Sequence, residues 1–164
     1  MPTLEQDLGF LRHAFDVARR ARDAGDHPFG SILVGPEGDV LREQGNGYRE
    51  EGGDRTAHAE RLLASWAAKA FDLGYLQRST LYSSAEPCAM CAGAIYWAGI
   101  GRVVYGQSEH RLKAATGAHD ENPTLALPCR NVFSAGQRET EVLGPLLEEE
   151  AGQLQQGYWS ERDG

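Results

Sequence analysis

Thr56-Ala57-His58-Ala59-Glu60 and, further along the chain, Pro87-Cys88-Ala89-Met90-Cys91 are the two segments that decide how this chain folds and what it can bind. His58 offers an imidazole nitrogen and Cys88 and Cys91 offer two thiolates, which together make three of the four ligands of a tetrahedral zinc ion. A structural zinc site is closed by a fourth protein ligand, whereas a catalytic site keeps that position open for water. The two segments therefore predict a catalytic Zn²⁺ site.

The two cysteines also allow other interpretations. Their spacing at a predicted helix start places both sulfurs on one side of the helix, where the amide dipoles favour thiolate. Taken alone, a Cys-x-x-Cys pair is also typical of a redox dithiol or of buried structural thiols. The upstream His58, flanked by small alanines that let a metal approach closely, favours the metal site over these alternatives.

Glu60 is the predicted catalytic residue. It follows His58 by two positions, which is too near for a further ligand on the same helix face but suits proton exchange with water at the open position. The alternative is that its charge only compensates the dipole of a helix N-terminus. Its position relative to a zinc-type histidine favours the catalytic role.

Composition limits the classes of partner. The 164 residues fit one domain, residues 1–164, and 16 Lys and Arg against 24 Asp and Glu give a formal charge of −8. That charge repels nucleic acid and acidic membranes and favours a small-molecule substrate. The sequence has no signal-peptide pattern and no membrane-span pattern, and three cysteines, two of them in a metal-type pair, fit a reducing compartment. We expect a soluble, cytoplasmic protein with a small-molecule partner and with neither nucleic-acid nor membrane partners.

Hydrophobic periodicity predicts alternating helices and strands. An amphipathic helix should run from residue 4 to near Gly25, and Thr56 is the expected cap of a long helix over residues 57–71. A strand-helix-strand unit over residues 81–106 implies parallel pairing. The predicted strands are 29–34, 40–44, 81–83 and 102–106, with weaker candidates at 131–134 and 140–143; the other predicted helices are 88–98 and 145–155, and the segment after Gly106 reads as a long loop.

The chain resembles the cytidine/cytosine deaminase superfamily, in particular its guanine deaminase, cytosine deaminase and transfer-RNA adenosine deaminase branch. The segments that carry the resemblance are Pro28-Phe29-Gly30, Asn46, Thr56 to Glu60, Glu86 to Ala94 and Arg102 to Gly106. The resemblance implies an α/β fold, a three-layer α/β/α sandwich around a mixed five-stranded sheet. It also implies one Zn²⁺ per subunit, a homodimer, and hydrolytic loss of ammonia from an aminated heterocycle.

The resemblance also implies which residues bind the substrate. Asn46 matches a position whose side-chain amide bonds the base, although a turn between two glycines explains Asn46 nearly as well. Trp97 favours a free base, because transfer-RNA enzymes usually have a polar segment there. The tail over residues 157–164 should fold over the site, either in its own chain or at a subunit interface. The predicted substrate-binding residues are Asn46, Phe29, Ala59, Trp97, Asp120, Tyr158, Trp159 and Glu161.

The resulting functional hypothesis is a zinc-dependent hydrolytic deaminase of a free nucleobase or related amino-heterocycle, with guanine favoured and cytosine next. Adenosine editing on transfer RNA and deamination of a nucleoside are alternatives within the superfamily. The non-enzyme alternative is a catalytically inactive, zinc-stabilised interaction domain, against which an intact Glu60 argues.

Overall fold

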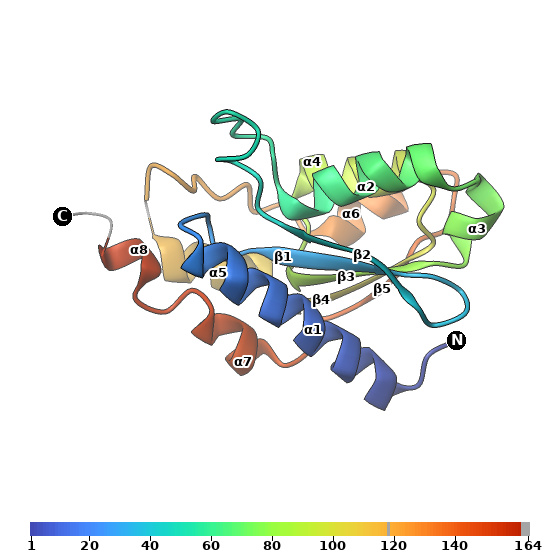
Figure 1. The fold of residues 1–164 in the computed structure, drawn as a ribbon, viewed down its shortest axis with the longest axis horizontal. Helices are drawn as coiled ribbons and strands as arrows, with labels where there is room; N and C mark the ends of the chain where they lie inside the picture. The colour runs from blue at the N-terminus through green and yellow to red at the C-terminus, as the bar shows by residue number, and fades with distance from the viewer. Residues whose placement is uncertain (118, 162–164) are drawn as a thin grey trace.

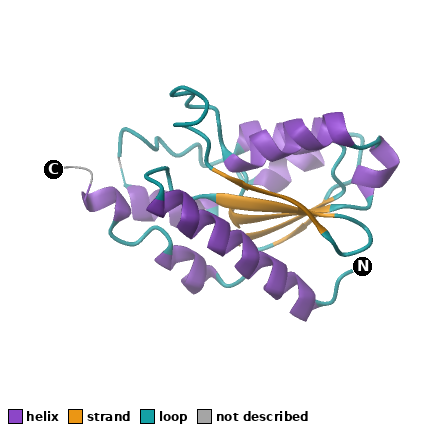
Figure 2. Cartoon of the chain, viewed as in Figure 1, coloured by secondary structure: helices purple, strands orange, loops and turns teal. Residues whose placement is uncertain are grey.

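The protein is a three-layer sandwich in which helices cover both faces of one sheet (Figures 1 and 2). The computed structural model describes residues 1–117 and 119–161. Helices α1 and α7 lie on one face of the sheet, and α2, α4 and α6 lie on the other. This arrangement confirms the predicted α/β/α architecture.

The elements follow the predicted order with several additions. In chain order they are α1 (Leu4–Asp23), β1 (Gly30–Val34), β2 (Val40–Gly45), α2 (Ala59–Ala70), α3 (Leu73–Gln77), β3 (Thr80–Ala85), α4 (Ala89–Ala98), β4 (Arg102–Gln107), α5 (Glu109–Thr116), α6 (Cys129–Ser134), β5 (Glu141–Leu143), α7 (Glu148–Gln153) and α8 (Tyr158–Glu161).

The sheet has five strands in the order β2-β1-β3-β4-β5. Strand β1 pairs antiparallel with β2 and with β3, whereas β3, β4 and β5 run parallel. The sheet is therefore mixed, and the parallel pairing predicted for β3 and β4 is confirmed. Strands β1, β3 and β4 are buried along their whole length because helices cover both of their faces.

Two hydrophobic clusters hold the layers together. One lies between the sheet and α2, α4 and α6, and includes Leu63, Leu81 and Ile95. The other lies between the sheet and α1 and α7, and includes Phe15 and Tyr82. Burying both faces fixes the register of each central strand, because a slip of one residue would exchange the side chains of the two clusters.

Three local predictions were wrong. Thr56 does not cap α2: His58 is the residue before the helix, and the Thr56 hydroxyl instead donates to Asp54 Oδ1 at 2.7 Å. Residues 131–134 form helix α6 rather than a strand. The helix predicted over residues 145–155 is the shorter α7 (Glu148–Gln153), which cannot begin before Glu148 because Leu147 has a φ of 50° in the left-handed region.

The segment after Gly106 also departs from the expected loop, because α5 begins there. The side chain of Ser108 accepts a hydrogen bond from the Arg111 amide at 3.2 Å, which caps the helix. Only a few of its residues, such as Leu112 and Thr116, are buried, so its periodic signal is weak. Among the described helices, none is long and apolar enough to cross a membrane.

Candidate active site

The predicted metal ligands meet at the starts of two neighbouring helices. His58 directly precedes α2 and Cys88 directly precedes α4, and these helices pack against each other. The Nδ1 atom of His58 lies 3.6 Å from Cys88 Sγ and 3.6 Å from Cys91 Sγ. Segments thirty residues apart in the sequence thus bring three donor atoms to one point.

The donor atoms fit zinc. Tetrahedral zinc with ordinary Zn–S and Zn–N bond lengths separates sulfur from nitrogen by about 3.6 Å, which is the distance found here. All three donor atoms lie within 4.8 Å of one another, and the group contains no fourth His, Cys, Asp or Glu ligand among the described residues. These side chains therefore form a three-ligand site of the catalytic type.

Electrostatics at the cluster favours a cation. A hydrogen bond from Cys91 lowers the pKa of Cys88 to about 4, so Cys88 is a thiolate at neutral pH. Cys91 and His58 each form a hydrogen bond with the Cys88 thiolate. Each bond raises the pKa of the residue that makes it. A divalent cation favours the deprotonated form of each ligand, because metal coordination replaces the shared protons.

Glu60 is buried beside the cluster and is held from the sheet. Ser83, near the end of β3, donates its hydroxyl to Glu60 Oε1 at 2.6 Å. Ser31, its cross-strand partner on β1, donates in turn to Ser83 Oγ at 3.4 Å. Burial raises the pKa of Glu60, while His58 and Ser83 act in the opposite direction. A buried carboxyl with a raised pKa next to a metal site suits proton transfer.

The C-terminal aromatics dock on their own chain at this end of the sheet. Trp159 is 4% exposed, and its indole ring lies 6.3 Å from the Phe29 ring and 5.4 Å from the His27 ring. Its Nε1 donates to Gln155 Oε1, and Gln155 Nε2 donates to the carbonyl oxygen of Pro28. Helix α8 is therefore attached to the segment that leads into β1.

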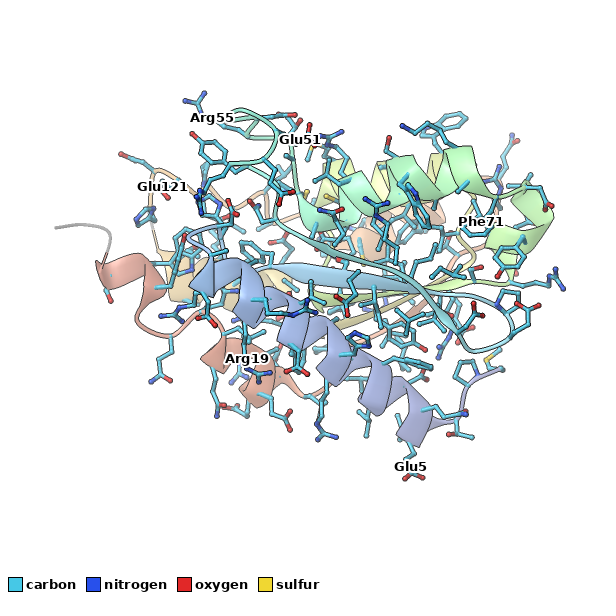
Figure 3. The ribbon with its side chains drawn as sticks, viewed as in Figure 1. Glu5, Arg19, Glu51, Arg55, Phe71 and Glu121 are labelled. Carbon is cyan, nitrogen blue, oxygen red and sulfur yellow. The ribbon has the colours of Figure 1, made fainter. Side chains whose placement is uncertain are left out.

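Two loops flank this end of the molecule. Glu51 and Arg55 mark the loop between β2 and α2, and Glu121 marks the loop between α5 and α6; Phe71, where α2 ends, lies at the opposite end (Figure 3). His27 Nε2 lies 3.0 Å from Glu121 Oε2, which ties the second loop to the start of β1. The cluster therefore sits at the loop end of the sheet.

The remaining predicted substrate-binding residues differ in their burial and in their contacts. Asn46 is buried, its Oδ1 accepts from the Tyr48 backbone N–H at 3.0 Å, and its backbone N–H donates to Phe29 O at 3.1 Å. These bonds fit the turn role and do not use the side-chain Nδ2. Ala59 is buried in the first turn of α2, and Asp120 is an exposed turn residue.

Trp97 and Glu161 stand apart from these groups. Trp97 is 80% exposed near the end of α4, and its ring packs against Tyr96, so it is not enclosed with the cluster in its own chain. The Glu161 side chain, like residues 162–164 of the predicted covering tail, lies outside the described residues.

Three polar residues with contacts to these segments were not singled out as site candidates from the sequence. Ser83 holds Glu60, Glu86 accepts hydrogen bonds from the Glu109 and Cys129 amides at 3.0 and 2.8 Å, and Glu109 is buried. The signal available for Ser83 was a hydroxyl at the carboxyl end of a parallel strand, where ligands commonly bind. No comparable signal marks Glu109, which reads as an ordinary acidic residue at a helix start.

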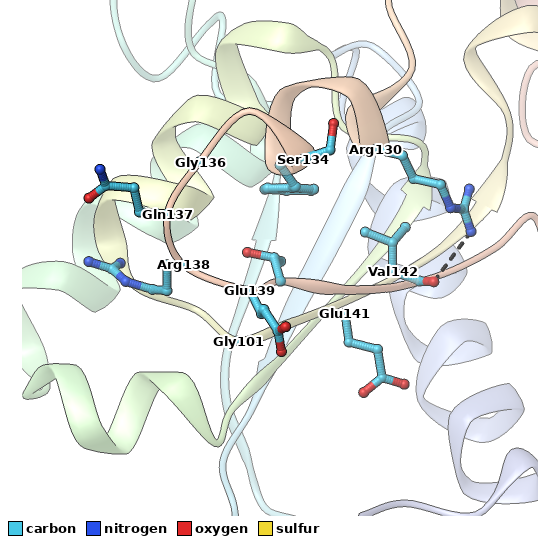
Figure 4. Close-up of a pocket in the computed structure, with 11 residues that line it drawn as sticks. Gly101, Arg130, Ser134, Gly136, Gln137, Arg138, Glu139, Glu141 and Val142 are labelled. Atoms are coloured by element: carbon cyan, nitrogen blue, oxygen red, sulfur yellow. Dashed lines mark hydrogen bonds between the residues drawn. The ribbon is translucent and has the colours of Figure 1, made fainter.

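A hollow beside α6 and β5 does not belong to the site. A cavity of about 660 Å³ opens beside α6 and β5, where Arg130, Arg138 and Glu139 contribute to its walls (Figure 4). Arg130 is engaged with Tyr105 Oη at 2.9 Å and with the carbonyl oxygen of Val142 at 3.3 Å. None of its lining residues belongs to the His58 cluster.

Comparison with known families decides the class of the site. Residues 4–107 match the model of the cytidine and deoxycytidylate deaminase zinc-binding region. The chain belongs to this family. It is accordingly a zinc-binding deaminase, a hydrolase that cleaves a carbon–nitrogen bond, and His58, Cys88 and Cys91 are the residues that fit the family's metal.

Relatives within the deaminase family act on different substrates. The chain is 41% identical over 155 residues to a probable cytosine deaminase of Schizosaccharomyces pombe, covering 94% of this chain and 93% of that protein. It is also 30% identical over 160 residues to a tRNA-specific adenosine deaminase of Bacillus subtilis, covering 96% and 91% of the two chains. The family is therefore established, and the particular base is not decided by these relatives.

Solved deaminase structures share the fold. A structure in complex with 8-azaguanine superposes with a TM-score of 0.76 at 25% identity, covering 94% of this chain and 84% of the other. The guanine deaminase of Bacillus subtilis superposes with a TM-score of 0.58 at 34% identity, covering 70% of each chain. Both agree with the cytidine deaminase-like fold predicted from the sequence.

Proposed function

We propose that this deaminase acts on a free nucleobase or a related amino-heterocycle, with guanine as the first candidate and cytosine as the second. The observation that carries the proposal is the meeting of three features at one end of the sheet. These are the three-ligand metal site, a buried carboxyl held by Ser83, and the Trp159 indole docked on its own chain beside Phe29. In this proposal the Trp159 indole roofs the site, an arrangement that suits a small flat substrate.

The proposed reaction replaces an exocyclic amine with oxygen, so that water and the amino-heterocycle become the oxo-heterocycle and ammonia. Zinc, when bound by His58, Cys88 and Cys91, supplies a Lewis acid that lowers the pKa of water. Glu60 Oε1 is engaged by Ser83, so we assign proton transfer to Oε2. Glu60 takes one proton from the attacking water and delivers it to the ring nitrogen beside the reacting carbon as the C–O bond forms. It then carries the remaining proton of the added hydroxyl to the exocyclic amine, which leaves as ammonia as the C–N bond breaks and the C=O bond forms.

Recognition of the ring is assigned to the residues around the docked tail. Phe29, Trp159 and Ala59 offer apolar contact, and the Asn46 side-chain amide offers a hydrogen bond to the base. Tyr158, Asp120 and Glu161 are the further substrate-binding residues of this proposal. In this proposal α8 forms the roof within the same chain, because its two aromatic residues, Tyr158 and Trp159, are both buried.

Adenosine deamination on transfer RNA is the second candidate, and the identity to the Bacillus subtilis enzyme favours it. The formal charge of −8 opposes it, because RNA binding draws much of its free energy from phosphate contacts with Lys and Arg. Binding of a transfer-RNA anticodon stem with a steep salt dependence, together with inosine formation, would support this candidate.

The deciding experiment measures ammonia release from guanine, cytosine, adenine, their nucleosides and amino-triazines. Wild-type protein loaded with zinc should deaminate a free base, and Glu60→Gln should lose turnover while retaining its zinc. Activity confined to transfer RNA would replace the proposal with the second candidate. Zinc binding without turnover of any compound would support the inactive interaction domain.

We further propose a homodimer, as in the resemblance stated above. An indole 80% exposed on α4 is costly to leave in water, and a second copy of the chain is the proposed cover for Trp97. Sedimentation of wild type and Trp97→Ala tests this: a dimer that becomes a monomer in the variant supports the proposal, and a monomeric wild type overturns it.

A further inference from the structure

Glu109 is a buried carboxyl that the proposed reaction does not use. It is the first residue of α5, directly after β4 and its capping Ser108. It is only 5% exposed, and its Oε2 atom has no hydrogen-bond partner among the described residues. A buried polar atom without a partner is costly, and native structures keep such atoms mainly where a ligand or a reaction uses them.

Glu86 fixes the position of Glu109 relative to the metal ligands. The Glu109 amide donates to Glu86 Oε1 at 3.0 Å, and the Cys129 amide donates to Glu86 Oε2 at 2.8 Å. Glu86 lies two residues before Cys88, in the segment that leads from β3 to α4. One carboxylate therefore joins the start of α5 to the segment that supplies the metal ligands, and it uses both of its oxygens to do so.

The charges that act on Glu109 are those of the site. Burial is the main cause that raises its pKa to about 8, the charges of Cys88, Glu86 and Glu60 act in the same direction, and His58 acts in the opposite direction. The hydrogen bond of its amide to Glu86, two residues before Cys88, places the start of α5 beside the segment that carries the metal ligands. The two acidic side chains differ in their contacts, because Glu60 is held by Ser83 whereas Glu109 Oε2 is unpartnered.

We propose that Glu109 is a specificity-determining residue that accepts a hydrogen bond at Oε2 from the ring N–H of a cyclic amide in the substrate. This inference rests on the proposed free-base deaminase function and names its substrate class: amino-heterocycles that carry a lactam N–H besides the amine that leaves. Guanine and cytosine both contain such a group, and adenosine does not. A site with a buried group built for an N–H discriminates strongly against a compound that lacks it, because the buried oxygen is then left unpaired.

The test combines protein variants with methylated substrates. The kcat/KM for ammonia release is measured for wild type, Glu109→Ala and Glu109→Gln with guanine, cytosine, 1-methylguanine and 1-methylcytosine. Glu37→Ala is the matched control, because Glu37 is an exposed glutamate in the turn between β1 and β2. Zinc content and the unfolding temperature of every variant are measured as readouts independent of activity.

Glu109→Ala should lower kcat/KM for the unmethylated base by about 10- to 100-fold, because the ring N–H is then buried without an acceptor. The methyl group should cost wild type a similar factor and cost Glu109→Ala much less, because the two changes remove the same contact. Glu109→Gln keeps an acceptor oxygen and should recover part of the loss, which keeps the test available if the alanine variant does not fold. Zinc content should be unchanged.

Equal methylation penalties in wild type and Glu109→Ala would overturn the inference while leaving the deaminase function intact. Loss of zinc in the folded Glu109→Gln variant would also overturn it, by showing that Glu109 supports the metal site. A wild type that releases ammonia from none of the four compounds would overturn the substrate class and, with the wider panel, the proposed function.

Discussion

The hydroxyl of Ser83 lies 2.6 Å from Oε1 of Glu60, which joins the end of β3 to the first turn of α2. The contact holds one oxygen of the buried carboxyl, and in the proposed reaction the other oxygen transfers protons. Because strands β1 and β3 are buried throughout, the hydroxyl is held by a rigid part of the fold.

Ser83→Ala should lower kcat with little change in KM. The hydroxyl donates to a carboxylate, and such a bond contributes roughly 1.5–3 kcal/mol, so a loss of about 10- to 100-fold in kcat is expected. Steady-state kinetics with the preferred base checks this, with Ser65→Ala as the control because Ser65 is exposed on the same helix, α2. An unchanged kcat in Ser83→Ala would show that the hydrogen bond from Ser83 is not needed to position the Glu60 carboxyl.

Cys88→Ala should abolish tight zinc binding and with it all turnover. Metal analysis of purified protein should find about one zinc ion per chain in wild type and much less in the variant, because removing a thiolate leaves only two protein ligands. Cys129→Ala is the matched control: Cys129 is buried at the start of α6, outside the metal group, and should retain zinc. Equal zinc in wild type and Cys88→Ala would contradict the assigned ligand set.

Asp7→Asn should destabilise the fold without touching the site. Arg102 donates to both oxygens of Asp7 at 2.7 and 2.8 Å, and Tyr82 donates to Oδ1 at 2.7 Å. Breaking a buried ion pair typically costs about 3–5 kcal/mol, which denaturant unfolding monitored at neutral pH would measure. Glu150→Gln, which breaks the exposed pair with Arg12, should change stability little.

The same pair predicts a pH dependence of stability. Burial alone would raise the pKa of Asp7, but the hydrogen bonds from Arg102 and Tyr82 outweigh it and lower the pKa. A carboxyl with a lowered folded-state pKa contributes stability above its unfolded pKa of about 3.9 and loses that contribution as pH falls through the folded value. The stability of wild type should therefore fall more steeply below about pH 4 than that of Asp7→Asn; parallel curves would contradict this assignment.

Trp159→Ala should raise KM by about tenfold while changing kcat less. The indole is proposed to cover the bound ring, and an aromatic contact of this kind contributes on the order of 1 kcal/mol or more. Its zinc content should match that of wild type. Trp97→Ala, assayed at a protein concentration where its oligomeric state is known, separates this effect from subunit contacts. A KM unaffected by Trp159→Ala would show that α8 does not close the site.

Much of the architecture could be predicted from the sequence. The spacing of apolar residues in α1, and the apolar stretches of β1, β3 and β4, reflect burial of one helix face and of both strand faces, so they leave a clear pattern. Helices α5 and α6 bury few residues, and their weak pattern explains why one was expected to be loop and the other a strand. The cap of α2 was misplaced because Thr56 found a nearer partner in Asp54.

What the sequence determined by itself is the metal chemistry, because His58, Cys88 and Cys91 are identified by residue type and by their places at helix starts, both of which are local properties. The tertiary structure decided the rest. It brought Ser83 to Glu60, docked Trp159 beside Phe29, and joined the backbone of Glu109 to Glu86. Each of these contacts joins segments whose distance in space depends on how the sheet is ordered and covered, and no local pattern in the chain encodes that distance.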